Sequence, residues 1–173
     1  MAKLMCYSYG MFVRRIQSEG WSDGNLPDDW VFVSIGEYIP EESEPHPLKS
    51  CGSVLNLDFD DISGYRVWEA ITDYNWTDVE KEIYKDVYGM SDEQAGVLFE
   101  FLDRNIGKNV MVHCSAGLSR SQGVVRFLLD MYPDIYRVEE TNPKNPCMIP
   151  NLYVTGLLKK EYYRKYGLMT DGC

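Results

Sequence analysis

The sequence predicts a single α/β domain in which a central, mostly parallel sheet is flanked by helices. The first observation is that short apolar runs typical of strands alternate along the chain with amphipathic runs typical of helices. The second is that 173 residues, 45% apolar and 13% aromatic, suit one folded domain with a proper core. We find neither an internal repeat nor a low-complexity linker, so residues 1–173 are expected to form one domain.

The first third of the chain reads as three strands. Residues 5–13 and 30–35 are two apolar runs separated by a segment rich in turn residues. Residues 37–47 contain three prolines and four glutamates, which is typical of an exposed loop. Residues 53–57 begin a third strand, which runs into an acidic segment at 58–61.

The middle of the chain is expected to be helical. Residues 64–90 are aromatic and acidic, and apolar side chains recur there every fourth residue over 79–87, as in a short amphipathic helix. Ser91, with Gln94 three residues later, predicts a capping box at the start of a second helix. Gly107 can end that helix. The residues expected on its buried face are Ala95, Leu98, Phe101, Leu102 and Ile106.

The last third continues the alternation. Residues 109–113 form a short buried strand, and residues 121–131 are apolar nearly all round, as expected of a helix in the middle of a domain. Pro133 stops that helix, and Pro150-Asn151 opens a last one. The last helix is expected to turn Leu152, Leu157 and Leu158 inward and to carry a basic tail of Lys159, Lys160, Arg164 and Lys165.

The net charge and the search for targeting signals restrict the partners and the location expected of this protein. The formal net charge is −10, and so acidic a surface disfavours nucleic acids and anionic membranes as partners because it repels their phosphates. We see neither a signal peptide nor a membrane span, which predicts a cytoplasmic location.

Cysteine usage points to free thiols. The five cysteines include no CxxC pair, which argues against a disulfide framework or a zinc site. Four of them are interpreted as inert packing residues: Cys6, Cys51, Cys147 and Cys173. The fifth, Cys114, stands in the unusual stretch HCSAGLSRSQ at 113–122.

This stretch joins the strand at 109–113 to the helix at 121–131, which is a favourable arrangement for binding an anion. Backbone N–H groups of such a loop and the positive end of the helix converge on one point. Gly117 permits a tight or φ-positive turn, and Arg120 adds a planar fork that can hold two oxygens of a phosphate. Cys114 at the rim would be a stabilised thiolate, placed as a nucleophile beneath a bound phosphoryl group.

The stretch resembles the signature of the cysteine-dependent protein tyrosine phosphatases. Cys114, five intervening residues and Arg120 carry the resemblance, with His113 before and Ser121 after. The form GLSRS is similar to the dual-specificity branch. The runs VFVSIGEYIP, VLNLDFDDI and SDEQAGVLFEFL resemble the elements that precede the loop in compact bacterial and viral members, so the resemblance covers residues 30–132 and makes 64–90 an insertion.

The resemblance implies the fold of that family and a division of roles among these residues. Cys114 would attack phosphorus to give a cysteinyl-phosphate, His113 would orient the loop and tune the thiolate, and Ser121 would help the thiolate leave during hydrolysis. No metal and no cofactor are implied. The residues that would bind the phosphate are Ser115, Ala116, Gly117, Leu118, Ser119 and Arg120.

The family also uses an aspartic acid to protonate the leaving group. Asp61 is the favoured candidate because it ends the strand that resembles the acid-bearing strand of the family. Asp78, in the sequence WTD, is similar to the acid loop of the classical enzymes but is also explained as a helix N-terminal acid. Asp60 is a third candidate, whereas Asp58 is expected to be a strand-end carboxylate.

The expected substrate is a phosphoprotein or phosphopeptide, with phosphotyrosine first and phosphoserine or phosphothreonine as further substrates. The variable loop positions carry no lysine or additional arginine, whereas family members that act on inositol lipids or RNA triphosphates need such charge. A monomer is the default. Two other classes remain open: a phosphopeptide-binding module that has lost catalysis, and a rhodanese-like sulfurtransferase.

Overall fold

The computed structural model describes residues 1–37, 46–61, 89–141 and 150–167. Its centre is a five-stranded sheet with the order β3-β2-β4-β1-β5, and every pair of neighbouring strands is parallel. The α/β class is therefore confirmed, and the sheet of the described chain is wholly rather than mostly parallel. The strands are β1 (Ala2–Ser8), β2 (Trp30–Gly36), β3 (Val54–Asp58), β4 (Asn109–Cys114) and β5 (Tyr136–Glu140).

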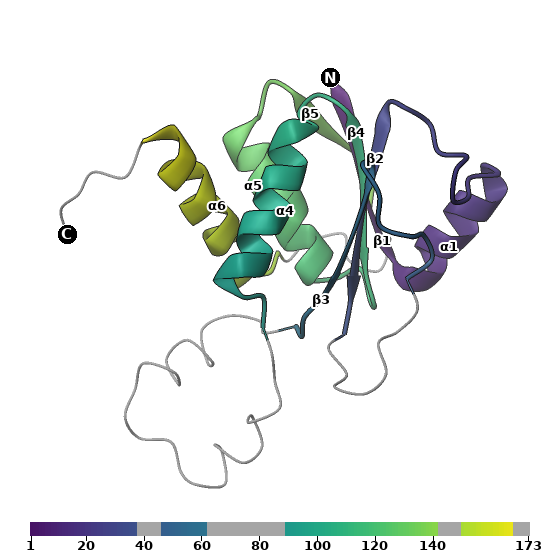
Figure 1. Cartoon of the computed structure of the whole chain (residues 1–173), viewed down its shortest axis with the longest axis horizontal. Helices are drawn as coiled ribbons and strands as arrows, with labels where there is room; N and C mark the ends of the chain where they lie inside the picture. Colours follow the sequence, from purple (N-terminus) through teal and green to yellow (C-terminus); the bar gives the residue numbers. More distant parts are fainter. Residues whose placement is uncertain (38–45, 62–88, 142–149, 168–173) are drawn as a thin grey trace, which may run out of the picture.

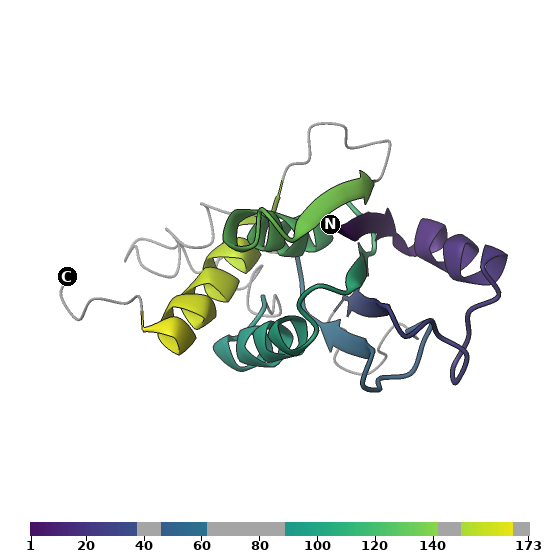
Figure 2. The ribbon, with the colours of Figure 1, turned by 90° about the horizontal axis from the view of Figure 1, so that it is seen from above.

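Four described helices flank this sheet. Helix α1 (Tyr9–Ser18) covers one face, and α4 (Asp92–Arg104) and α5 (Arg120–Met131) cover the other (Figures 1 and 2). Helix α6 (Leu152–Tyr166) packs on α4 and α5 and forms an outer layer. None of the helices in these described ranges is long and apolar enough to span a membrane.

The strand side chains alternate between two cores because neighbours along a strand point to opposite faces. In β1, Leu4 and Cys6 join the core beneath α4 and α5, whereas Met5 and Tyr7 join the core beneath α1. Both β2 and β4 are buried on both faces, which is typical of central strands in a parallel sheet. Strand β4 lies at the centre of the sheet, so its carboxyl end opens in the middle of one edge.

The predicted strand at 5–13 is wrong in its second half. The strand ends at Ser8 and helix α1 starts at Tyr9. The buried side chains of that helix are Phe12 and Ile16, one helical turn apart, so the helical period already begins where a continuous apolar run suggested a strand.

The other predicted strands and the capped helix are confirmed. The Ser91 hydroxyl accepts a hydrogen bond from the Gln94 backbone N–H, and the Gln94 side chain accepts one from the Ser91 N–H. The helix ends at Arg104, so Gly107, with φ of 89°, lies in the turn beyond it rather than at the cap. The helix expected over 79–87 and most of the segment 64–90 lie outside the described residues.

Strand β5 was not predicted. In its sequence, YRVEE, Tyr136 is buried, Val138 packs partly against the same core and the other three residues are charged, as suits an edge strand. Two apolar residues at alternate positions are too short a pattern to recognise as a strand.

Helix α6 starts where predicted, and two of its three predicted inward residues are confirmed: Leu158 is buried and Leu157 packs against the core. Asn151 caps it by accepting a hydrogen bond from the Val154 N–H, and its buried side chains are Val154, Thr155, Leu158 and Glu161. Leu152 is 69% exposed, so its predicted inward orientation is wrong. The cap fixes where the helix begins, and the inward face then falls at the spacing of Val154 and Leu158.

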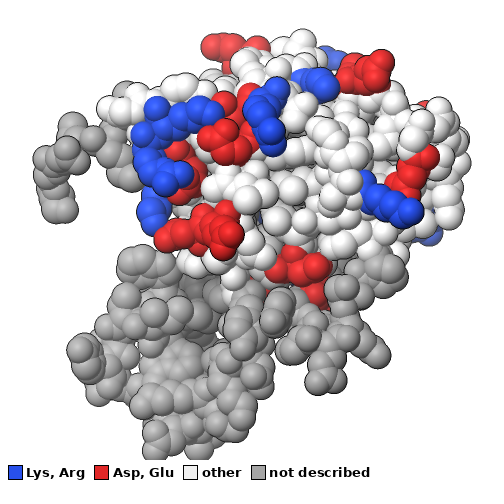
Figure 3. Space-filling view, viewed as in Figure 1, with Lys and Arg blue, Asp and Glu red and all other residues white. Residues whose placement is uncertain are grey.

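The basic side chains of α6 form ion pairs within the chain. Their acidic partners lie on α4, on α5 and on α6 itself, and blue and red atoms are interleaved over this region in Figure 3. The pairs are Lys159–Asp130, Lys160–Asp92, Arg164–Glu161, Lys165–Glu100 and Lys165–Asp103.

Candidate active site

The candidate site begins at Cys114, the last residue of β4. Its side chain is 2% exposed and lies where the central strand meets the loop that leads into α5. The carboxyl ends of β1, β2 and β3 lie at the same edge, because all the strands are parallel. Residues that follow those strands can therefore reach the loop.

Gly117 shapes the loop, as predicted. Its φ is 68°, a left-handed conformation that favours glycine. A Cβ atom at this position would lie 2.4 Å from the backbone N of Ser8 and 2.4 Å from the carbonyl carbon of Tyr7. The close approach aims the Gly117 N–H at the Cys114 Sγ atom, which accepts its hydrogen bond at 3.2 Å.

Ser121 stands between two sulfur atoms. Its Oγ atom lies 3.2 Å from Cys114 Sγ and accepts a hydrogen bond from Cys6 Sγ at 3.1 Å. Burial raises the pKa of Cys6 to about 12; the nearby Cys114 adds to this and the Ser121 hydrogen bond opposes it. Cys6 therefore remains a thiol at neutral pH, and the Ser121 hydrogen is free to be donated to Cys114.

The other cysteines differ in their burial. Cys6 is buried, as expected, but Cys51 is exposed, so its interpretation as a packing residue is wrong. Cys51 pairs with Val54 across a short turn before β3, and its Sγ atom lies 3.5 Å from the Ser53 hydroxyl at the surface. Cys147 and Cys173 lie outside the described residues.

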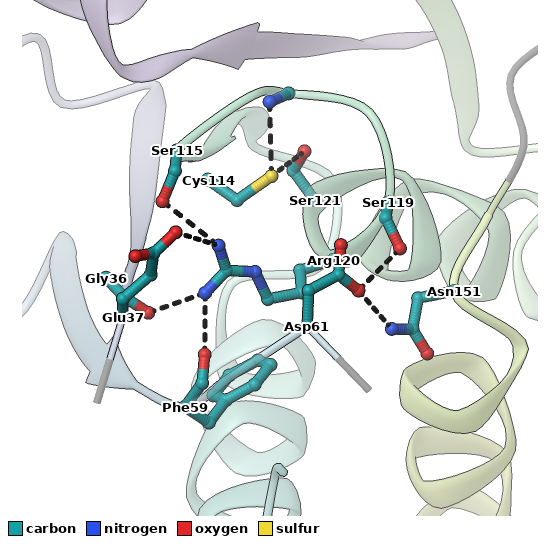
Figure 4. A network of polar contacts seen from close by, with 11 residues as sticks. Gly36, Glu37, Phe59, Asp61, Cys114, Ser115, Ser119, Arg120, Ser121 and Asn151 are labelled. Carbon is teal, nitrogen blue, oxygen red and sulfur yellow. Dashed lines mark hydrogen bonds and ion pairs between the residues drawn. The ribbon is translucent and has the colours of Figure 1, made fainter. Parts of the chain in front are cut away.

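Arg120, the first residue of α5, is 3% exposed and crosses beneath the loop (Figure 4). One terminal nitrogen donates to the carbonyl oxygens of Gly36 and Phe59, at 2.8 and 2.6 Å. The other donates to the Ser115 hydroxyl at 3.0 Å and pairs with Glu37 at 3.5 Å. Its Nε atom is buried without a hydrogen-bond partner among the described residues.

Asp61 is brought to the loop from the end of β3 (Figure 4). Its Oδ1 atom accepts a hydrogen bond from the Ser119 hydroxyl at 2.7 Å and one from the Asn151 side-chain amide at 2.9 Å. The carboxyl group itself is exposed. Asp61 therefore lies in contact with a side chain of the loop, and its role as the acid stays a prediction.

The other candidate acids are placed differently. Asp58 ends β3 and lies 3.1 Å from a ring nitrogen of His46, in keeping with a strand-end carboxylate. Asp60 is half-buried. Asp78 lies outside the described residues.

Asn151 reaches Asp61 because the start of α6 is anchored on α5. A Cβ atom at Gly123 would lie 2.7 Å from the Asn151 carbonyl oxygen, so the two helices approach closely there. The Asn151 N–H donates to the carbonyl oxygen of Ser119, and the Thr155 hydroxyl donates to that of Gly123. The sequence predicted Asn151 as a helix start, but not its contact with the loop.

His113 is buried and points to the face of the sheet opposite Cys114. Its ring packs against Phe12 and Tyr9 of α1, with centroid separations of 4.3 and 5.7 Å. Its Nε2 atom lies 2.6 Å from the Ser34 hydroxyl of β2. Burial and the nearby His46 lower the pKa of His113 to about 3, so the ring is neutral at physiological pH. The observed hydrogen bond thus joins His113 to β2 rather than to the loop.

The remaining loop residues line the space above Cys114 in different ways. The Ser115 hydroxyl contacts Arg120 and its carbonyl oxygen turns back to accept from the N–H of Tyr9. Ala116 and Leu118 are exposed, Leu118 by 38%, and Ser119 directs its hydroxyl to Asp61. The described residues contain no group of three or more His, Cys, Asp or Glu that could hold a metal ion.

Three polar residues of this region were missed in the sequence: Ser34, His46 and Glu37. Ser34 belongs to an apolar run, Glu37 follows it and His46 lies in the proline-rich loop, so each reaches its partner only through strand pairing or through a loop. A signal was available for His46, since the chain has only 2 histidines and the other precedes the candidate nucleophile.

Comparison with protein-family models, with curated proteins and with solved structures gives no match for this chain. Its chemistry must therefore be argued from the site itself: a buried thiol that accepts a backbone N–H, a buried guanidinium whose Nε atom has no partner among the described residues, and a carboxyl group held at the loop.

Proposed function

We propose that this chain is a cysteine-dependent phosphatase of the dual-specificity type, with the fold of that family, which hydrolyses phosphotyrosine in proteins or peptides. The observation that carries the proposal is the convergence of Cys114, the unpartnered Nε of Arg120 and the carboxyl group of Asp61 on one short loop. These groups supply a nucleophile, an anion-binding fork and a proton donor.

The proposed reaction has two steps. In the first, Cys114 Sγ forms a bond to phosphorus, the P–O bond to the leaving group breaks, and Asp61 transfers its proton to the departing oxygen. In the second, water attacks the cysteinyl-phosphate, the Asp61 carboxylate accepts a proton from that water, and the Cys114 thiolate leaves. Arg120 and the loop amides hold the equatorial oxygens throughout, and neither step needs a metal.

A monophosphate substrate fits the charge of the loop. Ser115, Ala116, Leu118 and Ser119 add no cation to Arg120, and Glu37 lies 3.5 Å from the guanidinium. A carboxylate in this place disfavours a second phosphate group by repulsion. Phosphoserine and phosphothreonine peptides are the further substrates to compare with phosphotyrosine peptides.

The deciding experiment is hydrolysis of an aryl phosphate in the presence of EDTA by the wild type, Cys114→Ser and Cys51→Ser. We expect Cys114→Ser to abolish turnover and Cys51→Ser, an exposed cysteine used as the matched control, to retain it. Loss of wild-type activity with EDTA would contradict the mechanism. Phosphopeptide binding without turnover would assign a binding module, and cyanide-dependent thiocyanate formation from thiosulfate would assign a sulfurtransferase.

A further inference from the structure

The chain contains 2 histidines, and a single serine hydroxyl connects them. The Ser34 Oγ atom lies 2.6 Å from Nε2 of His113 and 2.6 Å from Nδ1 of His46. The other ring nitrogen of His46, Nε2, lies 3.1 Å from Asp58 Oδ1, an ion-pair distance, although the two atoms are not aligned for a hydrogen bond. The four side chains form a continuous line, which we call the histidine relay: His113, Ser34, His46 and Asp58.

Strand pairing fixes the geometry of the relay. Ser34 and His113 are paired across β2 and β4, so their side chains leave the sheet on the same face. Gly36 and Asp58 are paired across β2 and β3, and a Cβ atom at Gly36 would lie 2.2 Å from Asp58 Oδ1. Because position 36 has no side chain, the Asp58 carboxylate has room to lie beside His46.

The Ser34 hydroxyl couples the protonation patterns of the two imidazole rings, because it has only one hydrogen to donate. If His46 carries a proton on Nδ1, Ser34 accepts that proton's hydrogen bond and donates to Nε2 of His113. If His46 Nδ1 is bare, Ser34 donates to it and accepts from an Nε2–H of His113. The proton of a neutral His113 therefore sits on Nδ1 in the first state and on Nε2 in the second.

The surroundings decide which ring changes charge. His113 is 2% exposed, and the groups that face it are Tyr9 and Phe12 of α1, Ser34 of β2, and the neighbouring Cys114 and Arg120. Burial, and then the proximity of His46, hold the pKa of His113 at about 3, while the Cys114 backbone opposes the shift. His113 therefore stays neutral near physiological pH and can respond only by changing its tautomer.

The surroundings of His46 differ from those of His113. It is half-buried in the described segment before β3, and Asp58 is the acidic group beside it. An ionised carboxylate at Nε2 favours a proton on that nitrogen, so uptake of a second proton must place it on Nδ1, against Ser34. Protonation of His46 thus selects the state in which His113 carries its proton on Nδ1.

We infer that Ser34 and His46 are positioning residues for the nucleophile: protonation of His46, transmitted by the Ser34 hydroxyl, sets the tautomer of His113 and through it the reactivity of Cys114. The meaning of this relay for catalysis rests on the proposed phosphatase function, whereas its existence does not. It acts on the residue directly before Cys114, and the Cys114 backbone is one of the groups that interact with the His113 ring.

The relay is tested directly by NMR of the two imidazole rings in protein labelled with ¹⁵N-histidine. In the wild type, we expect the His113 tautomer to change from Nδ1–H to Nε2–H as the pH rises, with the midpoint of the His46 titration. Ser34→Ala should uncouple the two rings, and His46→Asn, which keeps a polar group near the Nδ1 position but does not titrate, should fix one His113 tautomer at all pH values. A His113 tautomer that ignores the charge of His46, or that still follows it in Ser34→Ala, would overturn the relay.

The consequence for the nucleophile is measured without any phosphatase substrate. The rate of Cys114 alkylation by iodoacetamide, followed by peptide mass spectrometry against pH, should show a step of about threefold to tenfold, the size expected of one hydrogen bond, at the His46 midpoint. The step should vanish in Ser34→Ala and His46→Asn but persist in Ser18→Ala, a control on α1 whose hydroxyl bonds to Arg15. An unchanged profile in both relay variants would remove the link to Cys114 while leaving the proposed hydrolysis untouched.

Discussion

The Ser119 hydroxyl donates a hydrogen bond to Asp61 across 2.7 Å, which ties the end of β3 to the start of α5. Ser119 occupies the N-cap position of α5, yet its side chain makes no capping bond there. The hydroxyl that could have capped the helix instead holds a carboxyl group over the loop. With the Asn151 amide on the same oxygen, Asp61 has two donors that fix its position and leave its Oδ2 atom free of them.

Replacement of Asp61 by Asn should impair hydrolysis according to the leaving group. A phenolate with a pKa near 10 needs a proton as the P–O bond breaks, whereas a far more acidic leaving group does not. We expect kcat/KM to fall by about 10²–10⁴ for the poor leaving group and much less for the activated one. Steady-state kinetics with a series of aryl phosphates gives the comparison. If Asp78→Asn shows this dependence and Asp61→Asn does not, the assignment of the acid is wrong.

Two substitutions of Asn151 separate its effect on the position of Asp61 from its effect on the stability of α6. Asn151→Ser keeps an oxygen that can cap α6 but loses the amide that donates to Asp61. We expect a loss of about threefold to tenfold in kcat/KM for poor leaving groups, with little change in Tm. Asn151→Ala should show the same kinetic loss together with a lower Tm, because the cap is worth about 0.5–2 kcal/mol. Equal kinetics in the serine variant and the wild type would contradict the positioning role.

Arg120→Lys should be nearly as damaging as Arg120→Ala. The guanidinium bonds to the carbonyl oxygens of Gly36 and Phe59 and to the Ser115 hydroxyl while its Nε atom remains available. An ammonium group cannot occupy these positions and hold a phosphate at once. We expect both variants to lose about 10²–10³ in kcat/KM, measured on folded protein verified by circular dichroism. A lysine variant that keeps most of the activity would show that the fork is not used.

The parts of the fold that were predictable carry local signals. Strands β2 and β4 are continuous apolar runs, and α4 has a capping box and a regular apolar face, so each is visible in a short window of sequence. Strand β5 and the boundary between β1 and α1 are not, because an edge strand buries little and because an apolar run suits both a strand and a helix.

The site residues also divide into those predictable from local sequence and those placed by the tertiary fold. Cys114, Gly117 and Arg120 lie within seven consecutive positions between a buried strand and a helix, so a short window of sequence predicts an anion-binding loop. Asn151 and Ser34 reach the site through helix docking and strand register, which depend on the whole sheet. The proximity of Cys6 to Ser121 is likewise a product of the pairing of β1 with β4.

Acid should destabilise the protein through His113. Its pKa is lowered from 6.5 to about 3 in the folded chain, chiefly by burial. Between these values the unfolded chain binds a proton that the folded chain does not, so the free energy of unfolding falls as the pH is lowered through this window. The slope should approach about 1.4 kcal/mol per pH unit from this one group. Urea unfolding of the wild type and His113→Gln across the window measures the difference in slope, and identical slopes would contradict the neutral buried ring.

Ser121 should act on the second step of the reaction. Its hydroxyl accepts from the Cys6 thiol and contacts Cys114, so its hydrogen is directed to the sulfur that must leave as a thiolate. Loss of one hydrogen bond to a charged group corresponds to about 10-fold to 100-fold, and we expect Ser121→Ala to slow breakdown of the cysteinyl-phosphate by this factor while its formation changes little. Rapid-quench kinetics should then show a burst of the leaving group that the wild type lacks.

Cys6 provides the matched control for Ser121. Cys6→Ala removes the donor that orients the Ser121 hydroxyl and should slow breakdown in the same direction but to a smaller extent, whereas Cys6→Ser keeps a donor and should resemble the wild type. Burial raises the pKa of Cys6 to about 12, so at neutral pH it is a thiol rather than a second nucleophile. Slowed formation with normal breakdown in Ser121→Ala would contradict this role, because it would place the hydroxyl in the attack of Cys114 rather than in its departure.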